Sequence, residues 1–128
     1  MGFKFLSPEW IQAYAQEWNK NEKLKENLKS FSATIKYYID GKESDAVAIE
    51  VKNGEVISAG PAEQGKKYDF ELWASPENWQ KLAKGEMGPR AAMLTKRLKF
   101  KGSMITAMKY MSSFEESLRM MSRVPTEW

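Results

Sequence analysis

The chain of 128 residues is predicted to fold as an α+β domain in which helices pack on one face of a five-stranded, largely antiparallel sheet. Two features of the sequence favour this class. Five stretches alternate apolar and polar residues, which is the pattern of strands with one buried face. Other stretches begin with a Ser-Pro-Glu cap or carry apolar residues at helical spacing. The expected order is a helical region, four strands, two helices, one strand and two helices, which groups strands together as α+β folds do.

The first helical region is expected to start at Ser7-Pro8-Glu9, where a capping side chain, a first-turn proline and an acid follow one another. Apolar residues then recur at helical spacing: Trp10, Ile11, Tyr14, Ala15 and Trp18. After a break near 19–21, an apolar line continues through Leu24, Leu28 and Phe31. We expect the tryptophans to pack in the core, and the alternative is that they anchor the helix at a membrane interface.

Three strands are expected over residues 31–39, 46–52 and 55–59, where apolar and polar residues alternate. Asp40-Gly41 marks a turn, and Asn53-Gly54 is a strong signal for a tight hairpin. These strands are therefore predicted to form an antiparallel meander.

The second half begins with a strand over residues 68–75, in which Trp73 places a large apolar group on the otherwise polar face. A helix from Ser75-Pro76-Glu77 to Gly85, a short helix from Pro89 and a strand over 97–101 follow. Ser103 is expected to cap the next helix, and Ser113-Phe114-Glu115-Glu116 resembles a capping box that starts the last one.

The order of these elements from Phe70 to Met111 resembles the sterol carrier protein-2 (SCP-2) family of lipid-transfer domains. The similarity rests on a strand, the helix S-P-E-N-W, the turn and helix K-G-E-M-G-P-R-A-A-M-L, the strand R-L-K-F-K-G and a Met-rich helix. It implies a single SCP-2-like domain over residues 1–128, with an apolar cavity between the sheet and the C-terminal helices.

The composition excludes most common hydrolytic mechanisms, because the chain has neither cysteine nor histidine. It can form no disulfide, no zinc site of the usual kind and no Ser-His-Asp triad. An enzyme acting through carboxylates such as Asp40, Asp45 or Glu71 remains the least favoured alternative, since these acids form no evident pair. We therefore expect no catalytic activity, no metal and no cofactor, and a cytoplasmic location is consistent with the lack of cysteine.

Seven of the eight methionines lie in the last third of the chain. Methionine side chains are flexible and adapt to variable apolar shapes, so they suit a lipid cavity, although they also fill gaps in ordinary cores. With the family resemblance, this predicts the following ligand-binding residues: Phe70, Leu72, Trp79, Leu82, Met93, Leu98, Phe100, Met104, Ile105, Met108, Met111, Leu118 and Met121. Phe114 or Trp128 could instead plug the opening, and the C-terminal tail could fold over the cavity or extend into solvent.

Positive charge gathers in the same part of the chain. Nine basic and three acidic residues lie between Lys84 and Arg123, a net charge of +6, whereas the rest has 11 basic and 14 acidic residues, a net charge of −3. We predict transient contact with anionic lipid headgroups through Lys96, Arg97, Lys99 and Lys101. A solvated or edge-protecting strand face is the alternative. No nucleic-acid partner is expected, because no DNA- or RNA-binding pattern is present.

The sequence thus predicts a non-enzymatic protein that binds lipids or other apolar small molecules and could transfer them between membranes. The alternative is an accessory module whose groove binds a hydrophobic segment of a partner protein. The sequence does not predict the oligomeric state.

Overall fold

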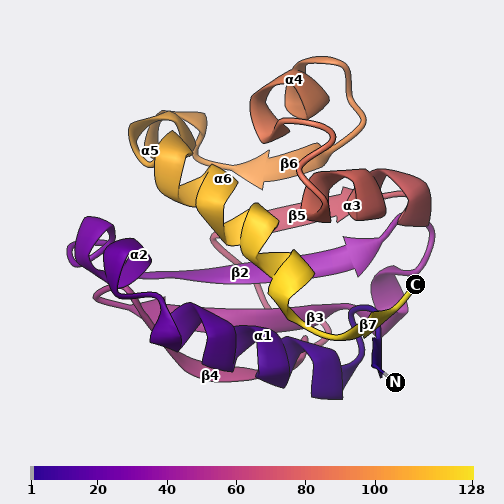
Figure 1. The fold of residues 1–128 in the computed structure, drawn as a ribbon, viewed down its shortest axis with the longest axis horizontal. Helices are drawn as coiled ribbons and strands as arrows, with labels where there is room; N and C mark the ends of the chain where they lie inside the picture. Colours follow the sequence, from indigo (N-terminus) through magenta and orange to yellow (C-terminus); the bar gives the residue numbers. More distant parts are fainter. Residues whose placement is uncertain (1) are drawn as a thin grey trace.

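The computed structural model describes residues 2–128 and confirms the α+β architecture (Figure 1). Its main sheet has the strand order β4-β3-β2-β5-β6. The strands are β2 (Ala33–Ile39), β3 (Val47–Lys52), β4 (Glu55–Pro61), β5 (Phe70–Ala74) and β6 (Lys99–Gly102). The predicted meander is confirmed, because β2 pairs with β3 and β3 with β4 in antiparallel register. β5 pairs with β2 in parallel and with β6 in antiparallel fashion, so the sheet is mixed and mostly antiparallel.

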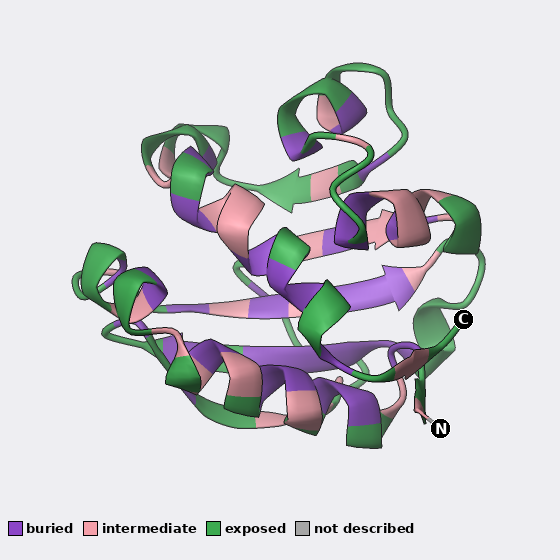
Figure 2. Cartoon of the chain, viewed as in Figure 1, coloured by how far each residue is buried: buried purple, intermediate pink, exposed green. Residues whose placement is uncertain are grey.

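Helices cover one face of this sheet (Figure 1). From the N-terminal side these are α1 (Pro8–Lys20) and α2 (Glu22–Asn27). From the C-terminal half come α3 (Pro76–Ala83), α4 (Pro89–Leu94), α5 (Met104–Lys109), α6 (Met111–Arg119) and the 3-10 turn η2 (Met120–Arg123). The purple ribbon segments in Figure 2 show that burial is greatest between α1, α6 and the central strands.

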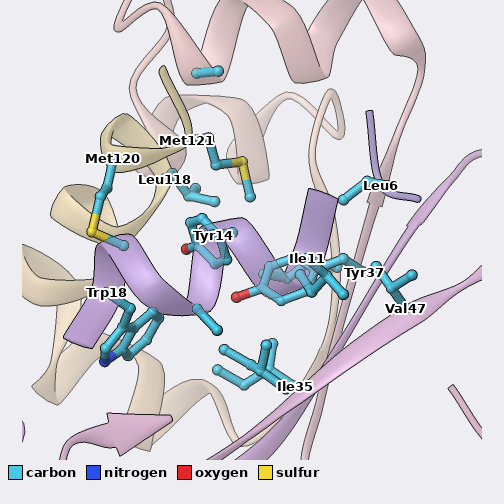
Figure 3. Close-up of a cluster of buried hydrophobic side chains, with 14 of the residues drawn as sticks. Leu6, Ile11, Tyr14, Trp18, Ile35, Tyr37, Val47, Leu118, Met120 and Met121 are labelled. Carbon is cyan, nitrogen blue, oxygen red and sulfur yellow. The ribbon is translucent and has the colours of Figure 1, made fainter. Parts of the chain in front are cut away.

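The tryptophans of α1 belong to the core, as expected. Trp10 and Trp18 are almost fully buried, and the indole Nε1 of Trp18 donates to the backbone oxygen of Gly54 at 2.9 Å. Figure 3 shows side chains of α1 between the C-terminal residues Leu118 and Met121 and the sheet. The apolar face of α1 is therefore used for packing, which excludes the interfacial-anchor alternative in this fold.

Helix starts agree with the cap predictions at three places. The hydroxyl oxygens of Ser7, Ser75 and Ser103 accept from the backbone N–H three residues ahead. The break after α1 is also confirmed, since the Asn21 side chain accepts from the backbone nitrogen of Leu24 and caps α2.

The capping box at Ser113 is a wrong prediction. α6 begins at Met111, so Ser113 lies within its first turn and is buried. The backbone nitrogen of Phe114 donates to the Tyr110 carbonyl at 2.9 Å. Because the Phe114 N–H already has a partner within the helix, no helix starts at Ser113.

The opposite face of the sheet is covered by its own aromatic and charged side chains. Trp73 stacks on Tyr38 with ring centroids 5.3 Å apart, which explains the large apolar residue on that face. Lys36 Nζ lies 2.8 Å from Glu43 Oε2, and this hydrogen bond holds the pKa of the Glu43 carboxyl below its usual range. Burial and the nearby carboxylates raise the pKa of Tyr38 to about 12.

The two chain ends meet in a short parallel sheet that the sequence did not predict. β1 (Phe3–Lys4) pairs with β7 (Thr126–Glu127), and Trp10 Nε1 donates to Thr126 Oγ1 at 2.9 Å. The Trp128 ring lies 4.4 Å from that of Phe5. The tail thus packs on the N-terminal segment and takes neither of the two predicted positions. Within residues 2–128, no helix has the length and apolar character needed to span a bilayer.

Candidate functional site

An apolar cavity of about 50 Å³ lies between the sheet and the C-terminal helices. Its lining residues come from all parts of the chain: Trp18, Leu28, Phe31, Ile35, Tyr37, Phe70, Leu72, Phe100, Thr106, Ala107, Tyr110, Ser113, Phe114 and Ser117. Among the described residues, this lining includes no Asp, Glu, Lys or Arg side chain. Its chemistry is suited to hydrocarbon.

The sheet wall of the cavity follows from strand register. Ile35 is paired with Phe70, and Tyr37 with Leu72. Leu72 is in turn opposite Phe100. Because paired residues point to the same face of a sheet, these side chains form one continuous apolar surface.

The helical wall is formed by α5 and α6. Ser113, Phe114 and Ser117 recur at i, i+1 and i+4 on α6 and so share one side of the helix. α5 contributes Thr106 and Ala107, and Ala107 is the only buried residue of that helix. Few buried side chains therefore hold α5 in place.

Two buried phenols extend from the cavity wall into the core. Tyr14 donates its hydroxyl proton to the backbone oxygen of Ser117 at 2.7 Å, and its ring packs edge-on against that of Tyr37 with centroids 6.1 Å apart. Burial raises the pKa of both tyrosines well above the usual value. Both hydroxyl groups therefore stay protonated at neutral pH.

The cavity is small for a lipid. A water molecule needs about 10–15 Å³ of such space, whereas pockets that enclose drug-sized ligands have about 300–1,000 Å³. A long acyl chain therefore fits only after the helical wall has moved away from the sheet.

A polar groove of about 410 Å³ adjoins the cavity. Cavity and groove share Phe31, Phe70, Thr106 and Tyr110. The other groove residues are mostly polar: Ser30, Ser32, Ala33, Asp69, Ser103 and Lys109. This arrangement gives the cavity a polar mouth beside α5.

The structure brings three of the predicted ligand-binding residues to the cavity, namely Phe70, Leu72 and Phe100. Others lie in the hydrophobic core outside the lining: Trp79, Leu82, Leu98, Leu118 and Met121. Met111 is buried and Met93 is half-buried at the core margin. Met104, Ile105 and Met108 point largely to solvent on α5. None of the methionines in residues 2–128 is among the lining residues.

Most of the cavity was not assigned from the sequence. The signal for Ile35 and Tyr37 was present in the alternation of the strand, but their role depends on the parallel pairing of β2 with β5. Leu28 and Phe31 were read as helix packing, and in the structure they line the cavity together with Phe114 and Ser117 of α6.

The predicted membrane-contact residues lie on and before the edge strand β6. Lys99 forms an ion pair with Asp40 at 3.2 Å, and Lys101 is paired with Glu71 in the sheet register. Lys96 and Arg97 are exposed in the turn before the strand. Asp40 and Glu71 are thus engaged on the open side of the sheet, away from the cavity lining.

Comparisons with known proteins agree with this architecture. The model of the SCP-2 sterol transfer family matches residues 11–115. A crystal structure of sterol carrier protein 2 superposes with a TM-score of 0.80 and 20% identity, covering 94% of this chain and 99% of that chain. A search of curated proteins gave no match.

Two solution structures extend the comparison. One is a conserved hypothetical protein of Thermus thermophilus, described as possibly a sterol carrier protein, with a TM-score of 0.81, 21% identity and coverage of 98% of this chain and 93% of that chain. The other is sterol carrier protein-2 of Aedes aegypti in complex with palmitate, with a TM-score of 0.52, 16% identity and coverage of 83% and 97%. At these identities the structures show a shared fold. Because the family model spans most of its length, the chain belongs to the SCP-2 sterol transfer family.

Proposed function

We propose that this protein is a non-enzymatic lipid carrier that buries a hydrocarbon chain between its sheet and its C-terminal helices. The observation that carries the proposal is the apolar cavity walled by Phe70, Leu72 and Phe100, whose described lining has no charged side chain. A carrier needs only such a surface, whereas a catalyst needs an acid or base beside its substrate.

The driving force is removal of hydrocarbon from water, at about 0.8 kcal/mol for each methylene group. About eight sheltered methylenes would contribute on the order of 6 kcal/mol before the costs of ordering the ligand and opening the wall. Affinity can then be substantial without strong selectivity among chains.

We favour a single acyl chain over a sterol as the ligand. A flexible chain enters a narrow cavity with a smaller displacement of α5 than a rigid ring system requires. The polar groove at the mouth, with Ser30, Ser103 and Lys109, suits a polar headgroup that remains near solvent. The Aedes aegypti protein of the same fold was solved with palmitate.

The predicted ligand contacts divide by position in this proposal. Phe70, Leu72 and Phe100 contact the chain directly, together with Ile35, Tyr37, Ala107 and Phe114. Met111 is buried on α6 outside the cavity lining. The core residues Trp79, Leu82, Leu98, Leu118 and Met121 keep the walls in position.

The test is binding of a fluorescent fatty acid to the purified protein in solution. Ala107→Leu adds bulk to the cavity wall and is expected to weaken binding about tenfold or more, since the added methyl groups occupy ligand space. Ala91→Leu is the matched control, because it makes the same change on the exposed side of α4. Equal affinity of both variants and the unmodified chain would reject the cavity as the binding site.

Delivery to and from membranes is the second part of the proposal, with Lys96, Arg97, Lys99 and Lys101 contributing attraction to anionic headgroups. We further propose that the protein acts in the cytoplasm and has no nucleic-acid partner. The alternative of a groove for a partner's hydrophobic segment is less well supported, because the apolar surface lies between sheet and helices while the open groove is largely polar.

A further inference from the structure

Within residues 2–128, four of the seven large exposed hydrophobic residues lie in one stretch of the chain. Leu94 at the end of α4 is 81% exposed, and Ile105 on α5 is 86% exposed. Met104 and Met108 are each 49% exposed. The remaining three, Phe3, Ile57 and Trp128, belong to other elements. Exposure of this kind is unexpected for a surface that meets only water.

These residues share one edge of the molecule, formed by α4, β6 and α5 and called here the docking edge (residues 89–109). Figure 1 shows the three elements together on the side opposite to α1 and β4. Most of this edge is coloured as exposed in Figure 2.

The docking edge is also strongly basic. Between residues 87 and 114 the chain has six basic residues and no Asp or Glu: Arg90, Lys96, Arg97, Lys99, Lys101 and Lys109. Lys99 pairs with Asp40. Lys109 shares the groove with Asp69, whose carboxylate accepts from the Thr34 backbone nitrogen. Among residues 2–128, the other four basic residues and Lys109 form no ion pair.

We propose that the docking edge binds an anionic lipid bilayer, with Ile105, Met104 and Met108 entering the headgroup region and the surrounding basic side chains contacting lipid phosphates. Exposed apolar side chains together with lysine and arginine on one surface are the combination that interfacial membrane binding uses. This surface does not fit a hydrophobic peptide, which would need a sheltered groove, because the Ile105 and Leu94 side chains are largely exposed.

Charge decides between a membrane and a second copy of the chain. A twofold dimer through this edge would place the same patch against itself, and the five cations without an ion pair would face the same five cations of the other copy. Nucleic acid would match the charge, but phosphate contacts would leave the Ile105 and Leu94 side chains exposed to water. An anionic bilayer matches both features.

The position of α5 gives this surface a role in loading, a step that rests on the proposed carrier function. One side of α5 holds Thr106 and Ala107 against the cavity, and its outer side carries Ile105. Docking therefore places the polar mouth of the cavity at the bilayer surface. A lipid could pass between membrane and cavity without crossing bulk water.

The test is co-sedimentation of the full chain with vesicles, with no added ligand. The unmodified chain should bind vesicles of phosphatidylcholine and phosphatidylserine, bind less as salt is raised, and bind pure phosphatidylcholine weakly. Ile105→Glu should weaken binding to the mixed vesicles by about tenfold or more. Ile57→Glu is the matched control, since Ile57 is 54% exposed on β4 at the opposite edge, and it should bind as the unmodified chain does.

Fatty acid binding in solution separates this inference from the carrier function. Ile105→Glu should retain that binding, because Ile105 is outside the cavity lining. Equal loss of vesicle binding in both variants, or no binding to the mixed vesicles, would overturn the docking proposal while fatty acid binding reports on the carrier function. Self-association or DNA binding in place of vesicle binding would also overturn it.

Discussion

The buried hydroxyl of Tyr14 donates to the backbone oxygen of Ser117, and the Tyr37 ring packs edge-on against the Tyr14 ring, which makes a buried aromatic pair. It joins the sheet, α1 and α6 beside the cavity, where hydrogen bonds are the only way to satisfy polar groups. These residues are important for stability, since each phenol must stay neutral while it is buried.

The pKa shifts of Tyr14 and Tyr37 predict how stability changes with pH. Their folded pKa values lie above the ordinary value of 10.0, so their contribution is complete below about pH 10 and is lost as pH rises beyond it. Urea unfolding should show the free energy of unfolding falling by roughly 1 to 3 kcal/mol per pH unit there. Tyr14→Phe should give a shallower decline. An unchanged decline in that variant would contradict a contribution from Tyr14.

Gly102 is the residue at which a small change should most disturb the cavity wall. Its φ is +145°, and an added Cβ would lie 2.6 Å from the Asp69 oxygen and 2.6 Å from the Phe70 ring. Gly102→Ala should therefore destabilise the protein by about 3 kcal/mol in thermal or urea unfolding. Gly60→Ala is the control, because its Cβ meets no atom within 4 Å. Similar stability of the two variants would contradict this description of the β5–β6 junction.

At the scale of elements, α5 has the fewest buried residues of the helices in the C-terminal half. It is six residues long, and Ala107 alone is buried, so it depends on its cap more than a packed helix does. The Ser103 hydroxyl oxygen accepts from the Thr106 backbone nitrogen at 3.2 Å. We infer that α5 opens locally to admit ligand.

Removal of this cap tests the mobility of α5. Ser103→Ala should lower the local stability of α5 by about 1 kcal/mol. The amides of α5 should then exchange hydrogen about fivefold faster, and a bound fatty acid should be released faster. Ser75→Ala removes the corresponding cap of α3 and should leave α5 exchange unchanged. If α5 exchanges at the original rate after Ser103→Ala, its opening does not depend on the cap.

Helix caps and strand faces were predictable because they are local. Ser7 and Ser75 cap their helices as the Ser-Pro-Glu pattern indicates, and Ser103 caps α5 as expected. The predicted helix start at Ser113 is wrong because the capping-box pattern does not take account of Tyr110, whose carbonyl accepts from the Phe114 N–H. Local pattern therefore predicts an available cap but not whether the preceding residues have already started the helix.

For the whole molecule, the family and the layer architecture were predictable, whereas the composition of the cavity was not. Phe70 and Phe100 were assigned by alternation. Leu28 and Phe31 join them only through the long-range pairing of β2 with β5 and the docking of α2 near α6. Met104 and Met108, which were assigned to the ligand site partly from methionine content, are each 49% exposed and form part of the docking edge, so their contact with ligand stays a prediction.

Native mass spectrometry of the full chain mixed with palmitic acid tests the central claim most directly. The account predicts a complex with one fatty acid per chain, and it predicts that Ala107→Leu reduces this complex while Ala91→Leu does not. Detection of only the bare chain at saturating fatty acid, or equal complex formation by both variants, would contradict a lipid carrier whose ligand lies between the sheet and α5.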